Sequence, residues 1–203
     1  MGPVSRAELA RQTGLALPTI IRLTDQLLQA GLAAAEQKVM MSSRGQPSLP
    51  LVLASGGAFA FGVCVRSDRL TLNLIDLSGH VLAEREEAID AVDRQHVEQR
   101  IMALSTELVA EAAIAAERVA GIGIALSGFF VGPPWRINAP LGMDDWAVED
   151  LDAALGERFG LPVLVENDGS AAAVGERIYG LGRSVRSFAY VYVDRGLGGG
   201  LVL

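Results

Sequence analysis

Cysteine, histidine and charged residues are scarce in this chain, and each shortage excludes a class of structure. With one cysteine, Cys64, among 203 residues, the chain cannot form an internal disulfide, and its two histidines are too few to complete a tetrahedral metal site. Charged residues make up 20% of the chain and apolar residues 50%, so the composition excludes disorder. No basic segment followed by an apolar one opens the sequence, as a secretion signal requires. We therefore expect a globular, cytoplasmic chain without a metal.

Long apolar runs are missing as well. The longest uncharged stretch covers residues 45–65, and it contains two prolines and several glycines and serines. A membrane-spanning helix needs about 20 mostly apolar residues, and prolines inside it would break it. The stretch is typical of a loop that leads into a strand, and no membrane partner is expected.

The charge is distributed unevenly. Residues 1–50 hold five basic and three acidic side chains, whereas the other 153 residues hold twelve arginines and twenty-one acids. The length of 203 residues allows one full domain and a smaller part, or one domain cut short. Any contact with nucleic acid is therefore expected from residues 1–50, because only that part carries a positive balance.

Residues 1–50 show the signals of two helices joined by a tight turn. Ser5 and Glu8 have the spacing of a capping box, which predicts a helix beginning after Ser5. Gly14 provides a turn residue, and Pro18 suits the first turn of a second helix that ends before Gly31.

The second helix has two distinct faces. Its apolar face is expected to pack and consists of Ile20, Leu23 and Leu27. Its polar face consists of Thr19, Arg22 and Gln26. Residues 33–41 are short enough for a hairpin wing, followed by a basic tip whose Arg44 can enter a minor groove. This order predicts a winged helix-turn-helix that binds DNA through these residues, and the alternative is an ordinary helical hairpin with a solvated face.

The remainder alternates between strand and helix patterns. The predicted strands are residues 59–65, 70–76, 80–86, 121–126 and 162–165, and the predicted helices are 93–118, 148–159 and 169–178. The resulting order, βββαβαβα, is that of the α/β, ribonuclease-H-like lobe of actin-like ATPases and sugar kinases. We expect this lobe to cover residues 51–180. Residues 181–203 are then expected to form the opening hairpin of a second, incomplete lobe.

Several strings resemble one known family. Residues 2–10, 13–15 and 27–32 (GPVSRAELA, TGL and LLQAGL) resemble the winged helix-turn-helix of repressors in the ROK family, named for repressor, open reading frame and kinase. Residues 165–176 (VENDGSAAAVGE) resemble the family's Glu-Asn-Asp segment followed by a small-residue helix. The resemblance runs to the last residue. It implies a sugar-responsive repressor that binds operator DNA, takes a sugar or sugar phosphate, and forms a homo-oligomer at full length.

The family also differs from this sequence near the N-terminus. It has a further helix before the first of these strings, and Met1 begins almost on that string, so the first helix of the three-helix core is expected to be missing. Ala16 and Ile21 stand where the family commonly has hydroxyl residues that cap the recognition helix and contact phosphate.

The resemblance implies a sugar site. In the kinases of the family the Asp of the Glu-Asn-Asp segment takes the proton from the sugar hydroxyl, and the Asn and Asp hold sugar hydroxyls; these positions are Asn167 and Asp168. The alternative for Asp168 is a helix N-cap. Gly128 matches a turn at the cleft, and Asn138 matches loosely an Asn that contacts sugar, with a turn-stabilising Asn as its alternative.

The same resemblance argues against catalysis. Cys64 replaces the acidic residue of the first phosphate segment, and Arg66 and Ser67 replace its two glycines. Gly196, Gly198 and Gly199 match the second phosphate segment, although glycines there can also serve close strand packing. We expect no ATP, no cofactor and no phosphoryl transfer. The alternatives are a ROK sugar kinase and a fragment that only binds or interacts.

Overall fold

The structure is a computed structural model, and it describes residues 2–36, 49–90, 92–132, 136–138, 142–193 and 196–203. The chain divides into two compact units. One contains residues 1–59 and 76–80, and the other contains residues 60–75 and 81–203.

The first unit begins with two helices, α1 (Arg6–Thr13) and α2 (Leu17–Gln29). Ser5 caps α1 as predicted, since its side chain accepts a hydrogen bond from the Glu8 backbone N–H at 3.2 Å. The Glu8 carboxylate completes no capping box, because it accepts from Arg11 and Gln12 instead. Gly14, at φ 72°, makes the predicted left-handed turn.

The two helices are joined through Arg6. Its guanidinium donates to Thr24 Oγ1 at 2.8 Å and to Asp25 Oδ1 at 2.6 Å, and both acceptors lie on α2. Ile20 and Thr24, one turn apart, are therefore the buried residues of α2. The predicted packing of Leu23 and Leu27 is wrong, because the stripe that faces α1 runs through Thr24 and leaves these leucines 36% and 43% exposed.

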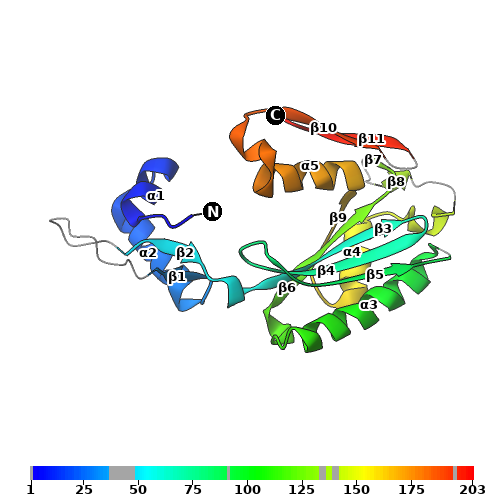
Figure 1. Ribbon diagram of the computed structural model, residues 1–203, viewed down its shortest axis with the longest axis horizontal. Helices are drawn as coiled ribbons and strands as arrows, with labels where there is room; N and C mark the ends of the chain where they lie inside the picture. The colour runs from blue at the N-terminus through cyan, green and yellow to red at the C-terminus, as the bar shows by residue number, and fades with distance from the viewer. Residues whose placement is uncertain (1, 37–48, 91, 133–135, 139–141, 194–195) are drawn as a thin grey trace. The chain divides into compact units, whose positions relative to one another are not determined.

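A short ribbon follows the helices. Strand β1 (Ala33–Ala35) pairs antiparallel with β2 (Leu51–Leu53), and Val4 forms a further bridge to Leu51 (Figure 1). Arg44, at the tip of the predicted wing, lies outside the described residues, as does all of 37–48.

The second unit is built on one mixed sheet in the order β5-β4-β3-β6-β9. Its strands are β3 (Phe59–Arg66), β4 (Arg69–Asp76), β5 (Val81–Ala88), β6 (Val119–Leu126) and β9 (Val163–Asn167). Strands β4 and β5 are antiparallel, whereas β6 and β9 are parallel. Buried and partly exposed residues alternate strictly along β3, which is why this strand was predictable from the sequence. The α/β class and the predicted meander are confirmed.

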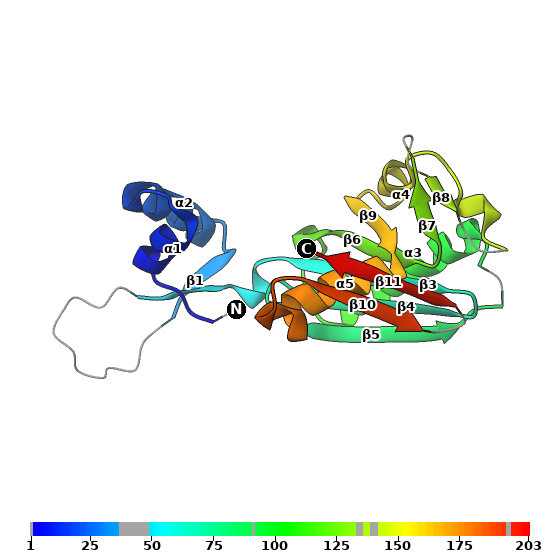
Figure 2. The ribbon, with the colours of Figure 1, turned by 90° about the horizontal axis from the view of Figure 1, so that it is seen from above.

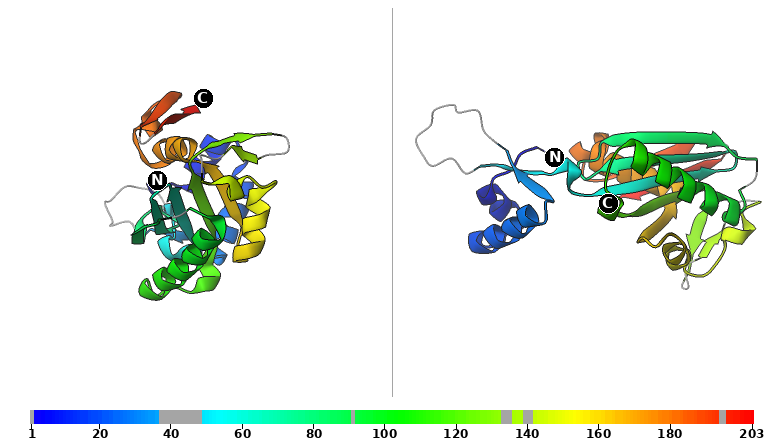
Figure 3. Two further views of the ribbon diagram at one scale, coloured as in Figure 1. Left: turned by 90° about the vertical axis from the view of Figure 1, so that its right-hand side faces the viewer. Right: turned by 90° about the horizontal axis from the view of Figure 1, so that it is seen from below.

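Helices cover both faces of this sheet (Figures 1 and 3). Helices α3 (Arg94–Glu111) and α4 (Leu151–Phe159) lie on one face, and α5 (Asp168–Tyr179) lies on the other. A hairpin of β10 (Phe188–Val193) and β11 (Leu197–Val202) runs along α5 (Figure 2). Single 3-10 turns occur at Ser55–Gly57, Ala116–Arg118, Asp144–Trp146 and Leu181–Ser184.

Three features differ from the sequence-based expectation. The helix predicted over 93–118 ends at Glu111, because Ala113 adopts a left-handed φ of 51°. Helix α4 begins only at Leu151, where the Asp150 side chain caps it. An additional hairpin of β7 (Phe129–Val131) and β8 (Arg136–Asn138) follows β6. Within the described part of the chain, no helix is both long and apolar enough to cross a bilayer.

Candidate functional site

A cavity of about 730 Å³ lies in the second unit, where three neighbouring strands end. Arg66 is the last residue of β3, Ser127 follows β6, and Asn167 is the last residue of β9. Sheets that contain parallel strands place their ligand sites beyond the carboxyl ends of these strands. The cavity is lined by Arg66, Ser67, Val92, Ser127, Gly128, Phe129, Phe130, Met143, Glu166, Asn167, Asp168, Ser170, Tyr192, Gly196, Leu197, Gly198 and Gly199.

Asn167 is the residue that caps α5. Its Oδ1 accepts from the Ser170 backbone N–H at 3.0 Å. Its amide nitrogen donates to the Gly128 carbonyl and, at 3.0 Å, to Asp168 Oδ1. The structure therefore assigns the N-cap to Asn167 and not to Asp168, and it leaves Asn167 without an amide hydrogen for a ligand.

Asp168 lies half-buried at the first position of α5. Its Oδ1 accepts from the Gly169 backbone N–H at 2.8 Å and from Asn167, while its Oδ2 accepts from Ser127 Oγ at 3.1 Å. An ionised carboxylate accepts about four hydrogen bonds, and the protein supplies three of them. The remaining capacity lies on Oδ2, beside the Ser127 hydroxyl.

Ser127 lines the cavity, and sequence reasoning placed it with Gly128 in the turn at the cleft but gave its side chain no role. Its hydroxyl donates to Asp168, so its oxygen faces the same cavity as an acceptor. The sequence signal for this role is the position of the hydroxyl, directly after β6. Because β6 is parallel to β9, Ser127 lies at the same edge of the sheet as Asn167, the last residue of β9.

Gly128 and Asn138 have separate roles. Gly128 has a φ of 130°, and a Cβ there would lie 2.8 Å from the Asn138 carbonyl oxygen, so no larger residue fits. Asn138 is exposed at the end of β8, paired with Phe129, and does not line the cavity. Of the predicted sugar residues, Gly128, Asn167 and Asp168 line the cavity together, whereas Asn138 adjoins Gly128 through its backbone carbonyl and does not line the cavity.

The replaced phosphate segment contributes side chains to the cavity. Arg66 and Ser67 line it, and the Arg66 guanidinium carbon lies 5.9 Å from the centroid of the Tyr192 ring. Cys64 is half-buried within β3 and is not a lining residue.

The glycines of β11, together with Gly196 just before it, fall into two groups. A Cβ on Gly200 would lie 2.5 Å from the Cβ of Ala173, and a Cβ on Gly169 would lie 2.7 Å from the Gly199 nitrogen, so α5 and β11 pack backbone to backbone. A Cβ on Gly196 or Gly198 would meet nothing within 4 Å. The packing role therefore applies to Gly199 and Gly200, whereas Gly196 and Gly198 face open space.

A second cavity of about 370 Å³ lies beside the β7–β8 hairpin and is lined in part by Asp150, Asp152 and Glu166. Burial raises the pKa of Asp152, and the carboxylates of Asp150 and Glu166 raise it further, against a hydrogen bond from the Val165 backbone that lowers it. Among the described residues, no three His, Cys, Asp or Glu side chains gather closely enough to hold a metal ion.

A mixed sheet between helices, with a polar corner at its strand ends and a glycine-rich hairpin beside it, defines a lobe of the sugar-kinase-like, actin-like fold. One solved structure with this fold is a ROK family glucokinase from Streptomyces griseus in complex with glucose and AMPPNP, which is 26% identical at a TM-score of 0.55 and covers 72% of this chain and 45% of that one. The model of the ROK family matches residues 61–203. The chain belongs to the ROK family, as the sequence resemblance predicted.

Other similar proteins match almost the whole chain. The uncharacterized protein y4fQ of Sinorhizobium fredii is 32% identical over 98% of this chain and 51% of its own length, and the xylose repressor of Bacillus spizizenii is 24% identical over 99% and 52%. The crystal structure of a ROK family transcriptional regulator, a homolog of the E. coli MLC protein, is 29% identical at a TM-score of 0.74 and covers 100% of this chain and 51% of that one. The chain thus spans about half the length of the curated relatives that it matches.

Proposed function

We propose that this chain is part of a sugar-responsive, DNA-binding transcriptional regulator that acts as a repressor. One observation carries the proposal: the same chain contains a pair of helices with a short ribbon and a lobe with a polar cavity. Ser127, Asn167 and Asp168, joined by hydrogen bonds, form the polar corner of that cavity. The similarity to a ROK regulator over the full chain, and to the xylose repressor, supports it.

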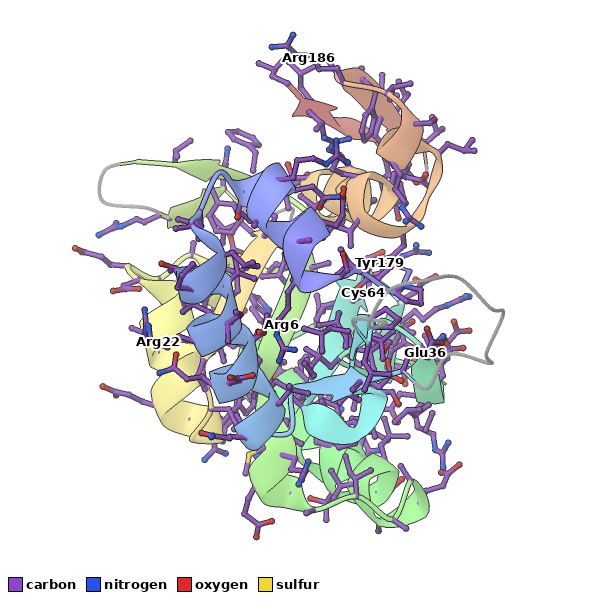
Figure 4. The ribbon with its side chains drawn as sticks, turned by 90° about the vertical axis from the view of Figure 1, so that its left-hand side faces the viewer. Arg6, Arg22, Glu36, Cys64, Tyr179 and Arg186 are labelled. Carbon is purple, nitrogen blue, oxygen red and sulfur yellow. The ribbon has the colours of Figure 1, made fainter. Side chains whose placement is uncertain are left out.

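The first unit supplies the DNA-binding part of the proposal. We assign α1, α2 and the β1–β2 ribbon to a winged helix-turn-helix, with α2 as the recognition helix. Arg22 and Gln26 are exposed on α2 and Thr19 is half-buried, so base or phosphate contacts fall to Arg22 and Gln26 first. In Figure 4, Arg22 points outward from α2, whereas Arg6 is directed to the other helix. Arg44 is proposed as a wing contact from the sequence alone.

The cavity supplies the effector site. A sugar presents several hydroxyl donors, and the corner offers acceptors: Asp168 Oδ2 and Ser127 Oγ. Asn167 is a positioning residue in this proposal, because its amide hydrogens already hold the Gly128 carbonyl and Asp168. Binding of a sugar from this side alone uses few hydrogen bonds, so the β10–β11 hairpin is proposed as the start of a second lobe that contributes others.

A sugar kinase is the second candidate, because Asp168 lines the cavity with acceptor capacity left on Oδ2 and a ROK glucokinase shares the fold. Phosphoryl transfer depends on positioning the phosphates and neutralising their charge. Arg66 and Ser67 line the cavity at the positions where kinases of the family have the glycines of the first phosphate segment. We therefore favour the regulator without enzymatic activity.

The decisive test measures DNA binding by gel shift, using the complete gene product and operator fragments that it selects from a random-sequence library. The Arg22→Ala variant is expected to lose about 1–3 kcal/mol of binding free energy, or about 5- to 150-fold in affinity. Arg11→Ala is the matched control, because Arg11 lies on α1 and pairs with Glu8 at 2.7 Å.

Xylose, glucose and N-acetylglucosamine, each alone and as its phosphate ester, are then added to the DNA complex. At least one of these compounds is expected to change the affinity for the operator. An Arg22→Ala variant with unchanged affinity would remove α2 as the recognition helix. Indifference of the DNA complex to every sugar and sugar phosphate would contradict a sugar-responsive regulator.

A further inference from the structure

The exposed surface of α2 carries two neighbouring apolar side chains beside a cation. Leu17 and Ile21 are four residues apart and therefore share one face of the helix, and they are 46% and 42% exposed. Arg22 follows Ile21 and points outward from α2 (Figure 4). Single exposed apolar side chains are common on protein surfaces, but an exposed pair next to an arginine matches a ligand that has both apolar and anionic groups.

This pair, the Leu17–Ile21 stripe, lies in the first half of α2. The buried residues of this helix are Ile20 and Thr24, and Thr24 is bonded to Arg6 of α1. At about 100° per residue, Arg22 lies on the opposite side of α2. In a helix-turn-helix, the N-terminal residues of the recognition helix contact base edges in the major groove. The stripe and Arg22 are therefore placed to reach bases.

The charges of the two helices favour DNA as the occupant of this surface. The acids on α1 and α2 are both neutralised within the helix pair, since Glu8 pairs with Arg11 at 2.7 Å and Asp25 with Arg6 at 2.6 Å. Arg22 has no ion-pair partner in the part of the chain that the structure describes. An apolar stripe beside an unbalanced cation suits a groove bordered by phosphates better than it suits an apolar protein surface.

The chemistry of the major groove identifies the base. Its one apolar group is the C5-methyl of thymine, whereas the other base edges present hydrogen-bond donors and acceptors. An isoleucine or leucine side chain offers no hydrogen bond to those edges, and covering an unpaired polar group costs free energy. A base pair that faces the Leu17–Ile21 stripe is therefore favourable when it presents a thymine methyl group.

We propose that Ile21 and Leu17 read thymine methyl groups in the major groove, beside the base or phosphate that Arg22 contacts. The stripe provides the preference for thymine, and the guanidinium provides attraction to the DNA. The inference rests on the proposed function, since it assumes that α2 is the recognition helix, and it names a base that this helix selects.

The test is a series of gel shifts with the complete gene product and an operator selected from a random-sequence library. Each thymine of the operator is replaced in turn by deoxyuridine, which keeps every hydrogen-bonding group of the base and lacks only the methyl. At a thymine that the stripe contacts, the replacement is expected to lower the affinity by about 3- to 10-fold, as removal of one buried methyl group implies.

Variants of the protein assign this effect to the stripe. Ile21→Ala should make thymine and deoxyuridine equivalent at one position, and Leu17→Ala should do so at a neighbouring position. Ile21→Ser gives a second test of the same position, because a hydroxyl bonds to polar base edges and has no preference for a methyl group. Leu27→Ala is the matched control, since Leu27 is 43% exposed but lies in the last turn of α2, and this variant should keep the preference.

The outcomes separate the inference from the proposed function. Equal affinity for thymine and deoxyuridine at every position overturns the inference, and so does a difference that Ile21→Ala, Ile21→Ser and Leu17→Ala all retain. If these variants lower the stability of the free protein and leave the preference unchanged, another protein segment or a second copy covers the stripe, and the inference is wrong. In each of these cases the proposed function stands if Arg22→Ala still weakens operator binding. If the wild-type protein binds no DNA sequence-specifically, both proposals fail.

Discussion

Two adjacent side chains at the start of α5 differ in the hydrogen-bonding capacity that they leave for a ligand. Asn167 is fully engaged as a donor, since its amide hydrogens bind the Gly128 carbonyl and Asp168. Asp168 is held by Asn167, Gly169 and Ser127 and retains acceptor capacity on Oδ2. A carboxylate restrained in this way loses little freedom when a ligand hydroxyl arrives, which favours Asp168 as the principal contact.

A second restrained carboxylate, Asp76, should determine part of the acid stability of the chain. Burial alone would raise its pKa, but hydrogen bonds from the His80 backbone and ring and from the Ser78 backbone lower the pKa below its usual value. A carboxyl with a lowered folded-state pKa stabilises the protein above its unfolded pKa of about 4, and the stabilisation is lost as the pH falls through the folded value.

In Asp76→Asn, the unfolding free energy should therefore fall less steeply than in the wild type as the pH decreases below about pH 4. Denaturant unfolding at several pH values gives this slope for the wild type and the variant. His80→Ala is the graded control, because it removes the ring donor, 3.1 Å from Asp76 Oδ2, and leaves the backbone donors. It should give an intermediate slope, and identical slopes for all three proteins would contradict the assignment.

At the scale of elements, α5 and β11 depend on glycine for their close contact. Gly200→Ala would bring its Cβ to 2.5 Å from that of Ala173 and 3.0 Å from the Gly169 carbonyl oxygen. Overpacking of this kind typically costs about 1–3 kcal/mol. Gly198→Ala, two residues earlier on the same strand, meets nothing within 4 Å and should leave the stability nearly unchanged.

Thermal or denaturant unfolding of the two variants distinguishes the roles of these glycines. Equal destabilisation would show that backbone freedom and not contact distance decides the need for glycine in β11. If Gly200→Ala left the unfolding free energy unchanged, α5 and β11 could move apart at no cost in stability. The close contact between them would then not contribute to stability.

The elements that sequence could predict are those with a repeating pattern. The alternation along β3 and β4 gave the meander, and the Gly-rich hairpin and α5 followed from local signals. The early end of α3 was not readable, because Ala113 has the left-handed conformation without being a glycine. The contact between the Ser127 and Asp168 side chains was not readable, because the two residues are 41 positions apart and the parallel pairing of β6 with β9 brings them together.

At the scale of the whole molecule, the lobe is similar in fold both to a ROK glucokinase and to a ROK transcriptional regulator, and our proposal distinguishes the two by the residues at the end of β3. Asp168 Oδ2 accepts a hydrogen bond from Ser127 Oγ at 3.1 Å and can accept another from a ligand hydroxyl. A kinase must also hold a nucleotide and its magnesium in line with that hydroxyl. In this chain the end of β3 presents Arg66 and Ser67 to the cavity, with Arg66 stacked on Tyr192 from β10.

The protein is therefore expected to bind its sugar without turning it over. A ligand at ten times its Kd should add about 1.4 kcal/mol to the unfolding free energy, which raises Tm by about 3–6 °C in a domain of this size. Asp168→Asn should abolish this rise. A coupled assay with ATP, magnesium and the same sugar should detect no sugar-dependent ADP release. Kinases typically turn over at about 1–100 per second, so activity of that order would be detected. Sugar-dependent ADP release by the wild-type protein would restore the kinase, and its loss in Asp168→Asn would assign that activity to this cavity.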